Sequence, residues 1–143
     1  MRKKSLLIIS LALSASFAVG GLLAPTTALA QQAKVSKKVG DPLAAALEAG
    51  KKGQYAQALA KLKAADEASG KTAFEQFKIS ETYGFIYSQQ HNYAAAATAF
   101  ERSLNSGQLP AGQVNERVKQ LALLHWQSPR NLNKVIEYAN RYL

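Results

Sequence analysis

A pattern of large and small apolar residues recurs three times in this chain, and it restricts the possible folds more than any other feature. In residues 90–104, helical spacing places five of them on one face: Tyr93, Ala96, Ala97, Phe100 and Leu104. Residues 54–65 repeat the pattern with Tyr55, Ala58, Leu62 and Ala65, and residues 131–143 with Leu132, Val135, Ala139 and Tyr142. Ala58, Ala96 and Val135 are 38 and 39 residues apart. A helix recurring at this spacing indicates stacked helical units that bury their apolar faces against one another.

The repeat resembles the tetratricopeptide family, in which the second helix of each unit carries Tyr-x-x-Ala-x-x-x-Phe-x-x-Ala. Tyr93, Ala96, Phe100 and Ser103 match it, as do Tyr55, Ala58, Leu62 and Ala65. The family's first helix carries Leu-Gly-x-x-Tyr, with the glycine twelve residues before the alanine. Tyr83-Gly84 and Tyr87 match closely; Ala45-Ala46 with Ala49, and Ala122-Leu123 with Trp126, are the weaker counterparts. The third copy departs from the family at Leu123, Val135 and Ala139.

The resemblance implies an all-α fold: a right-handed α-solenoid of about three helix-turn-helix repeats and six helices. The repeats would cover about residues 41–70, 72–107 and 109–143. The alternative is a helical bundle with alanine-rich interfaces. A small residue lets two helices approach closely, and a large one fills the space opposite. The expected packing residues are Tyr55, Ala58, Leu62, Ala65, Tyr83, Gly84, Tyr87, Tyr93, Ala96 and Phe100.

Turn and capping signals predict where the helices begin and end. Asp41-Pro42 favours the start of the first helix, and Gly50 and Gly53 favour its end. The capping box Thr72–Glu75 predicts a helix from about Ala73 to Gln90 that is apolar all round and therefore buried on several sides. The remaining signals are Asn92 as the cap of the fourth helix, Leu109-Pro110 before the fifth and Ser128-Pro129 before the sixth.

Residues 1–30 are typical of a signal peptide. A basic start precedes an uncharged run in residues 6–19, and Ala28-Leu29-Ala30 fits the cleavage pattern of signal peptidase. An uncleaved anchor over residues 6–23 is the alternative. Cleavage predicts a periplasmic or secreted protein that meets the membrane only transiently, through the leader. Residues 31–40, with Lys34, Lys37 and Lys38, are expected to be a flexible basic linker.

The residue types point away from catalysis. The chain has no cysteine, which excludes disulfides and thiolate metal sites, and no phosphate-binding glycine loop or nucleophile elbow. His91 and His125 have no acidic partner at a metal-ligand spacing, so we expect structural histidines, no metal and no cofactor. The formal charge is +9, three of it in the leader. The acidic residues all follow the leader, so a mixed surface without specific nucleic-acid binding is expected.

By the family resemblance, the first helix of each repeat would line a concave groove. The implied groove residues are Leu43, Leu47 and Lys51; Lys78, Glu81, Phe85 and Ser88; and Arg117, Gln120, Leu124 and Gln127. An apolar floor with three cations suits an extended peptide that carries an acidic group or a terminal carboxylate.

Two functions follow as hypotheses. One is a non-catalytic scaffold or adaptor of the bacterial periplasm that binds a protein or peptide. The alternative is an envelope-polymer binder or the helical accessory domain of a cell-wall enzyme. The last helix is apolar to its end, through Val135, Ile136, Ala139 and Leu143, more than one preceding helix can cover. We therefore expect either that the chain is part of a longer array, or that this helix frays or mediates self-association.

Overall fold

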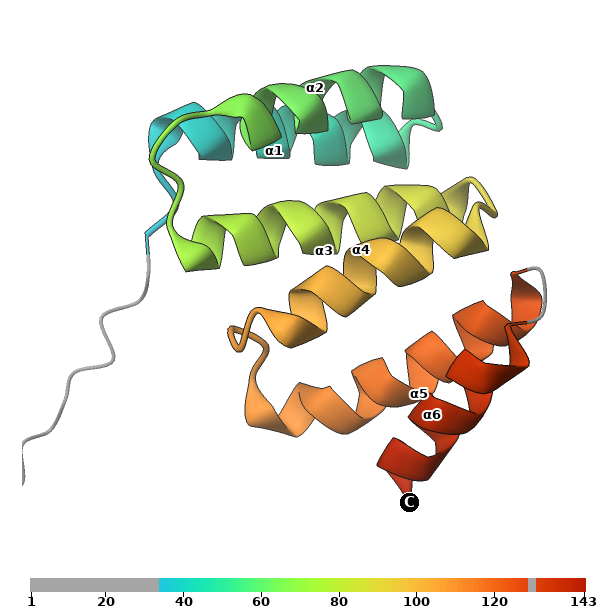
Figure 1. Ribbon diagram of the computed structural model, residues 1–143. Helices are drawn as coiled ribbons and strands as arrows, with labels where there is room; N and C mark the ends of the chain where they lie inside the picture. Colours follow the sequence, from blue (N-terminus) through green and yellow to red (C-terminus); the bar gives the residue numbers. More distant parts are fainter. Residues whose placement is uncertain (1–33, 129–130) are drawn as a thin grey trace, which may run out of the picture. The chain divides into compact units, whose positions relative to one another are not determined.

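The computed structural model describes residues 34–128 and 131–143, which form α-helices and no strand (Figure 1). Their bounds are α1 Lys37–Lys51, α2 Tyr55–Glu67, α3 Ala73–Gln89, α4 Tyr93–Asn105, α5 Ala111–Gln127 and α6 Leu132–Tyr142. The prediction of an all-α chain with six helices is therefore confirmed for this part of the chain. None of these helices has the length and apolar character needed to cross a bilayer. The predicted leader, residues 1–30, lies outside the described residues.

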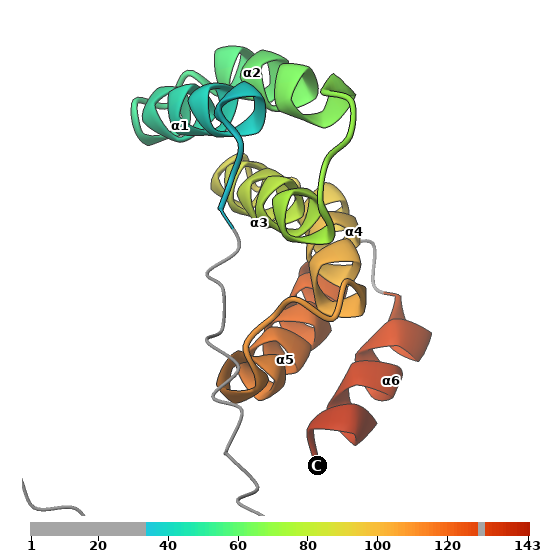
Figure 2. The ribbon, with the colours of Figure 1, turned by 90° about the vertical axis from the view of Figure 1, so that its left-hand side faces the viewer.

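The helices are arranged as three pairs of neighbours, α1 with α2, α3 with α4, and α5 with α6, and each pair makes extensive contacts. Further contacts join α1 to α3, α2 to α3 and α4 to α5. In Figure 2, α1, α3 and α5 lie toward one side, and α2, α4 and α6 toward the other. The described helices thus form two layers, one from the first and one from the second member of each pair.

α3 contributes to two hydrophobic cores. Ile79 and Ile86 join the core built with α1 and α2, while Phe77 joins the core built with α4, α5 and α6. The prediction that this helix is buried on several sides is confirmed, because α1, α2 and α4 all contact it. The first core also contains Val39, Leu43, Ala46, Ala49, Ala58, Leu62 and Ala65, and the second Ala96, Ala97, Phe100, Leu104, Leu109, Val118, Leu121, Leu124 and Tyr138.

Two glycines allow helices to approach closely. A Cβ atom placed on Gly84 of α3 would lie 2.6 Å from Cδ1 and Cζ of Phe100 on α4, as the sequence pattern predicts. A Cβ atom on Gly50 of α1 would collide with Cδ1 of Ile86 on α3. Gly50 was expected to end its helix, but it is helical and buried, because α1 and α3 meet there. Gly53, with a φ of 72°, follows the end of α1.

The first two helix pairs share the same turn, 38 residues apart. The amide of Gln54 donates to the carbonyl of Ala49, and that of Asn92 to the carbonyl of Tyr87, both at 2.9 Å. The residue before each donor has a positive φ, 72° at Gly53 and 58° at His91. The sequence repeat is thus also a repeat of local backbone structure.

The third pair follows the same spacing of 38, and the expected 39 was wrong. The large buried side chains of α2, α4 and α6 are Leu62, Phe100 and Tyr138, each 38 residues after the last. Ala139 and half of Leu123 are exposed, although the alignment placed both at packing positions. The difference arises because α6 turns Tyr138 toward α4 and α5, where its hydroxyl donates to Glu101 at 2.9 Å.

Two helices begin elsewhere than predicted. α1 begins at Lys37 rather than at Asp41, so residues 37–40 are helical and not a linker; residues 31–33 lie outside the described residues. The reason is Val39, which is fully buried in the first core. α6 begins at Leu132, with the side chain of Asn131 accepting a hydrogen bond from the amide of Lys134, rather than after Ser128-Pro129. The capping box at Thr72 and the cap at Asn92 are both confirmed.

Candidate functional site

The predicted groove residues lie on the layer of α1, α3 and α5, but they differ in accessibility. Leu43 and Leu124 are buried in the two cores, so neither can contact a ligand in an open groove. Three others are half-buried, namely Leu47, Ser88 and Gln120, and four are exposed, namely Lys51, Lys78, Phe85 and Gln127.

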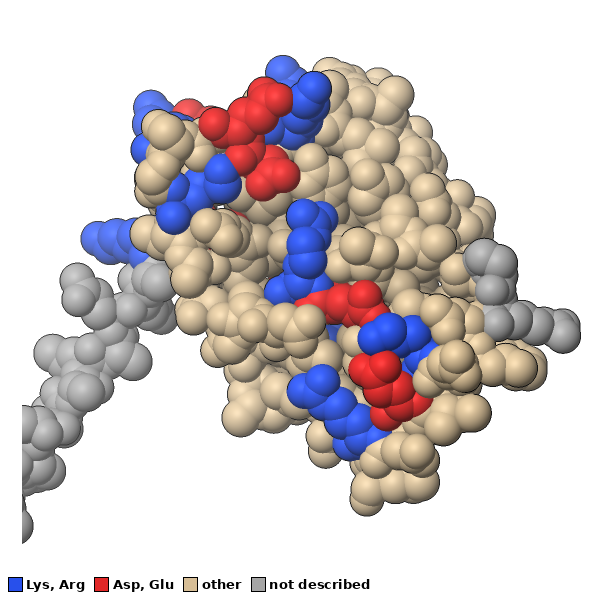
Figure 3. Space-filling view, in the orientation of Figure 1, with Lys and Arg blue, Asp and Glu red and all other residues tan. Residues whose placement is uncertain are grey.

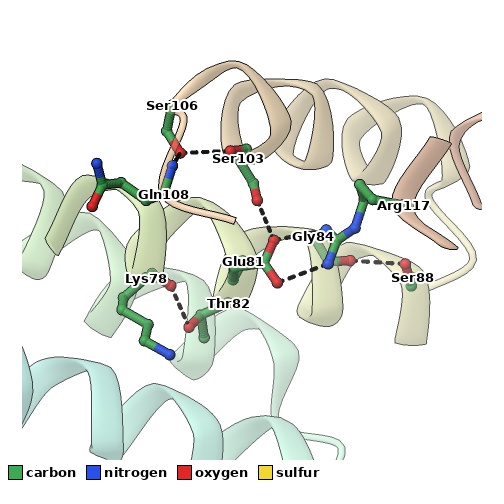
Figure 4. Close-up of polar contacts among 9 residues, drawn as sticks. All are labelled: Lys78, Glu81, Thr82, Gly84, Ser88, Ser103, Ser106, Gln108 and Arg117. Atoms are coloured by element: carbon green, nitrogen blue, oxygen red, sulfur yellow. Dashed lines mark hydrogen bonds and ion pairs between the residues drawn. The ribbon is translucent and has the colours of Figure 1, made fainter. Parts of the chain in front are cut away.

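Glu81 and Arg117 bind each other rather than facing an open surface. The guanidinium of Arg117 on α5 donates two hydrogen bonds to the Glu81 carboxylate on α3, at 2.7 and 2.8 Å (Figure 4). The buried hydroxyl of Ser103 on α4 donates to the same carboxylate, and Arg117 lies 4.0 Å from the ring centre of Phe100. Bidentate pairing fixes orientation as well as charge. The pair therefore holds three helices together, and the groove loses one of its three predicted cations.

The remaining open part of this layer contains two cations and one ring. Lys78 lies 5.4 and 5.6 Å from the ring centres of Phe74 and Phe77, and Lys51 is paired with Glu48 at 3.4 Å. Phe85, 37% exposed, extends its ring over Gly50 of α1. The hydroxyl of Ser88 donates to the carbonyl of Gly84 in its own helix.

A polar cluster that the sequence did not reveal joins the last three helices. One oxygen of Glu101 on α4 accepts from the Tyr138 hydroxyl at 2.9 Å and lies 3.0 Å from Nε2 of His125 and 3.8 Å from Nζ of Lys134. The rings of His125 and Tyr138 are stacked, 5.7 Å apart. Burial and the neighbouring Glu101 raise the pKa of Tyr138 above its ordinary value. No spacing rule could have found this cluster, because its members lie on three different helices.

A second unforeseen contact joins α1 to α3 through Glu75. Its carboxylate accepts from the hydroxyl of Ser36 and, at 2.7 Å, from the Ser36 amide, in addition to the capping-box amide of Thr72 at 2.8 Å. These hydrogen bonds, first that from the Ser36 hydroxyl, lower the pKa of Glu75 to about 2. The sequence predicted the cap but not its partner before α1.

Most of the large exposed hydrophobic residues of the described chain lie on α5 and α6. We call Leu123, Leu132, Ile136 and Tyr142 the C-terminal apolar surface; they are 52%, 52%, 58% and 44% exposed. Leu123 and Tyr142 also border an apolar pocket of about 250 Å³ between α5 and α6, with Ala122, Tyr138 and Ala139. The expectation that α6 would leave apolar side chains uncovered is therefore confirmed for this chain as described.

A larger and more polar pocket, of about 490 Å³, lies where α2 and α4 end and α3 begins. Phe77 and Ser80, both nearly buried, belong to its lining. The other lining residues are Asp66, Ala73, Gln76, Arg102, Asn105 and Ser106. On the face of α2, α4 and α6 that Figure 3 shows, acidic side chains over the end of α2 lie near a basic side chain that rises over α4.

Among the described residues no group of histidine, aspartate and glutamate side chains could hold a metal ion. The two most connected carboxylates, Glu81 and Glu101, are engaged by side chains that connect helices. Comparisons of the chain with family models, with curated proteins and with solved structures found no match. The geometry and the sequence are therefore the basis for any functional assignment.

Proposed function

We propose that this chain is a non-catalytic protein-interaction module, a scaffold or adaptor built as a right-handed solenoid of three tetratricopeptide-like helix pairs. The common spacing of 38 residues, the shared turn of the first two pairs and the two-layer arrangement support this architecture. The pattern of residues 1–30 supports export to the periplasm or secretion.

The observation that carries the proposal is the C-terminal apolar surface. Four large side chains, each about half exposed, lie around an apolar pocket on one helix pair. Exposed apolar residues that gather in one place mark protein-interaction sites, because covering them removes apolar area from water. The partner is accordingly a protein or peptide with an apolar face.

The predicted groove on α1, α3 and α5 remains a second place for a peptide, with fewer available groups than the sequence suggested. Lys51, Lys78 and Phe85 are exposed there, whereas Arg117 is already paired with Glu81. A peptide with an acidic group would still find two cations beside a ring.

The test is site-specific photo-crosslinking in living cells of the source organism, followed by mass spectrometry. A photoreactive amino acid is placed at Ile136 of the C-terminal apolar surface, at Phe85 of the groove, or at Lys61 of α2 as an exposed control. We expect a discrete crosslinked partner at Ile136 and none at Lys61. Equal yields at Ile136 and Lys61, or no crosslink at either Ile136 or Phe85, would contradict the proposal.

Salt separates this function from binding to an anionic envelope polymer. An apolar contact persists when salt is raised from about 0.1 to 1 M, because ions at these concentrations screen charges within roughly 3–10 Å. Retention of the Ile136 partner in 1 M salt supports an interaction module. Its loss, with binding restored on dilution, would favour attraction through the lysines instead.

A further inference from the structure

We propose that the pocket where α2, α3 and α4 meet binds a small zwitterion, an apolar amino acid or a short peptide, through Arg102 and Asp66. The site lies apart from the C-terminal apolar surface and does not depend on it. Its volume of about 490 Å³ lies within the roughly 300–1,000 Å³ of ordinary ligand pockets.

The two charged groups of the pocket are available to a ligand. Neither Arg102 nor Asp66 forms an ion pair with another described residue. The guanidinium carbon of Arg102 lies 5.8 Å from the ring centre of Tyr83. Burial first, and then the charge of Asp66, raise the pKa of Tyr83, while the charge of Arg102 lowers it. Both charges therefore act on the same region of α3, from α4 and from α2.

The ends of the helices favour the same division of charge. α2 and α4 end at this pocket, at Glu67 and Asn105, and α3 begins there at Ala73. The carboxyl end of a helix favours a positive group, and the amino end a negative one. An ammonium group is thus favoured near Asp66, and a carboxylate near Arg102.

The other lining residues suit a ligand that is apolar between its charges. Phe77 is 5% exposed and Ala73 carries only a methyl group, so they offer apolar contact. The side chains of Gln76 and Asn105 hold no hydrogen bond to another described residue and can bond to a carboxylate or a peptide group. A simple anion would meet Asp66 and a simple cation would meet Arg102, so a molecule carrying both charges fits best.

The experiment is a titration of the purified full chain with glycyl-phenylalanine, followed by NMR. Free phenylalanine forms a second arm, and it separates an amino-acid site from a peptide site. Forms of the dipeptide with the amine acetylated or the carboxylate amidated test each charge. We expect saturable shifts at Phe77, Ser80 and Asn105 with a dissociation constant of roughly 0.1–1 mM, typical of a ligand this small. Each blocked form should bind about tenfold more weakly, because it loses a charge-assisted hydrogen bond.

Variants assign the two roles. Arg102→Gln and Asp66→Asn should each weaken the unblocked dipeptide about tenfold. Arg141→Gln and Glu67→Gln, which change exposed charges outside the pocket lining, should leave binding unchanged. Thermal melting confirms that all four are folded. Absence of saturable shifts up to about 10 mM, or equal binding of blocked and unblocked forms, overturns the proposal. So does loss of binding on Arg102→Gln alone, which would mean a simple anion site.

Discussion

Gly84 is the residue at which the packing of the chain leaves least room. A Cβ atom there would lie 2.6 Å from two ring carbons of Phe100, and that ring is covered on another side by Arg117 at 4.0 Å. Overpacking costs roughly 1–3 kcal/mol, and alanine's helix propensity returns at most about 1 kcal/mol. We expect Gly84→Ala to lower the free energy of unfolding by about 1 kcal/mol or more, as measured by urea denaturation.

Gly112 provides the matched control, because it is also a helical glycine but has no neighbouring atom within 4 Å of the added Cβ. Gly112→Ala should be neutral or stabilise by up to about 1 kcal/mol. If both substitutions stabilise alike, the close approach of α3 and α4 is not a source of stability.

Glu75 makes the stability of the chain depend on pH. Its pKa falls from 4.5 to about 2 in the folded chain, so its stabilising effect is complete above 4.5 and is lost as the pH falls toward 2. We expect Glu75→Gln to be less stable than the parent at pH 7 and to lose less stability between pH 4.5 and 2. Urea denaturation across this window measures the difference. Glu67→Gln, at an exposed surface pair, should instead follow the parent.

At the same scale, the sequence predicts residues that act through size and not those that act through distant partners. Gly84, Ala96 and Phe100 were predictable because small and large residues recur at helical spacing. Glu81 and Arg117 were singled out as groove residues, but their pairing joins positions 36 residues apart on separate helices. No local rule determines which of the many charges on neighbouring helices will meet, so this contact required the structure.

At the scale of the element, α6 is held mainly by one side chain. Tyr138 is the only residue of α6 that is buried, and its hydroxyl binds Glu101 of α4. Tyr138→Phe removes that hydrogen bond, worth roughly 0.5–1.5 kcal/mol. Hydrogen exchange of α6 amides should therefore speed up about two- to tenfold, with α2 and α3 unchanged.

Tyr142→Phe is the control for this change, because Tyr142 is 44% exposed and its loss of a hydroxyl should leave exchange as it was. Uniform acceleration in all helices after Tyr138→Phe would mean that α6 opens only with the whole chain.

Helix boundaries were predicted well where a side chain caps the helix and poorly where burial decides. Thr72 and Asn92 were recognised because each accepts from an amide of the first turn. The start of α1 was missed because Asp41-Pro42 looks like a beginning, although Val39 must be helical to be buried. The register of α6 was missed by one residue because Val135 and Lys134 both lie near the position that alanine fills in α4.

At the scale of the whole molecule, the C-terminal apolar surface should allow two copies of the chain to associate. Burying apolar side chains of this size stabilises by roughly 1.5–3 kcal/mol each. We expect light scattering to show dimers that increase with concentration, and Ile136→Asp to abolish them. Asn133→Asp, which adds the same charge on the exposed side of the same helix, should dimerise normally. A strict monomer at high concentration would mean that this surface awaits a different partner.

Because α3 supplies side chains to both cores, neither core can come apart while the other keeps α3 in place. In a stack whose units share only an interface, melting can spread from an end, one unit at a time. Here α1 to α4 are bound to the fate of a single helix, and calorimetry should show them melting in one transition whose calorimetric and van't Hoff enthalpies agree. α3 thus makes the first two repeats one cooperative folding unit, longer than either repeat.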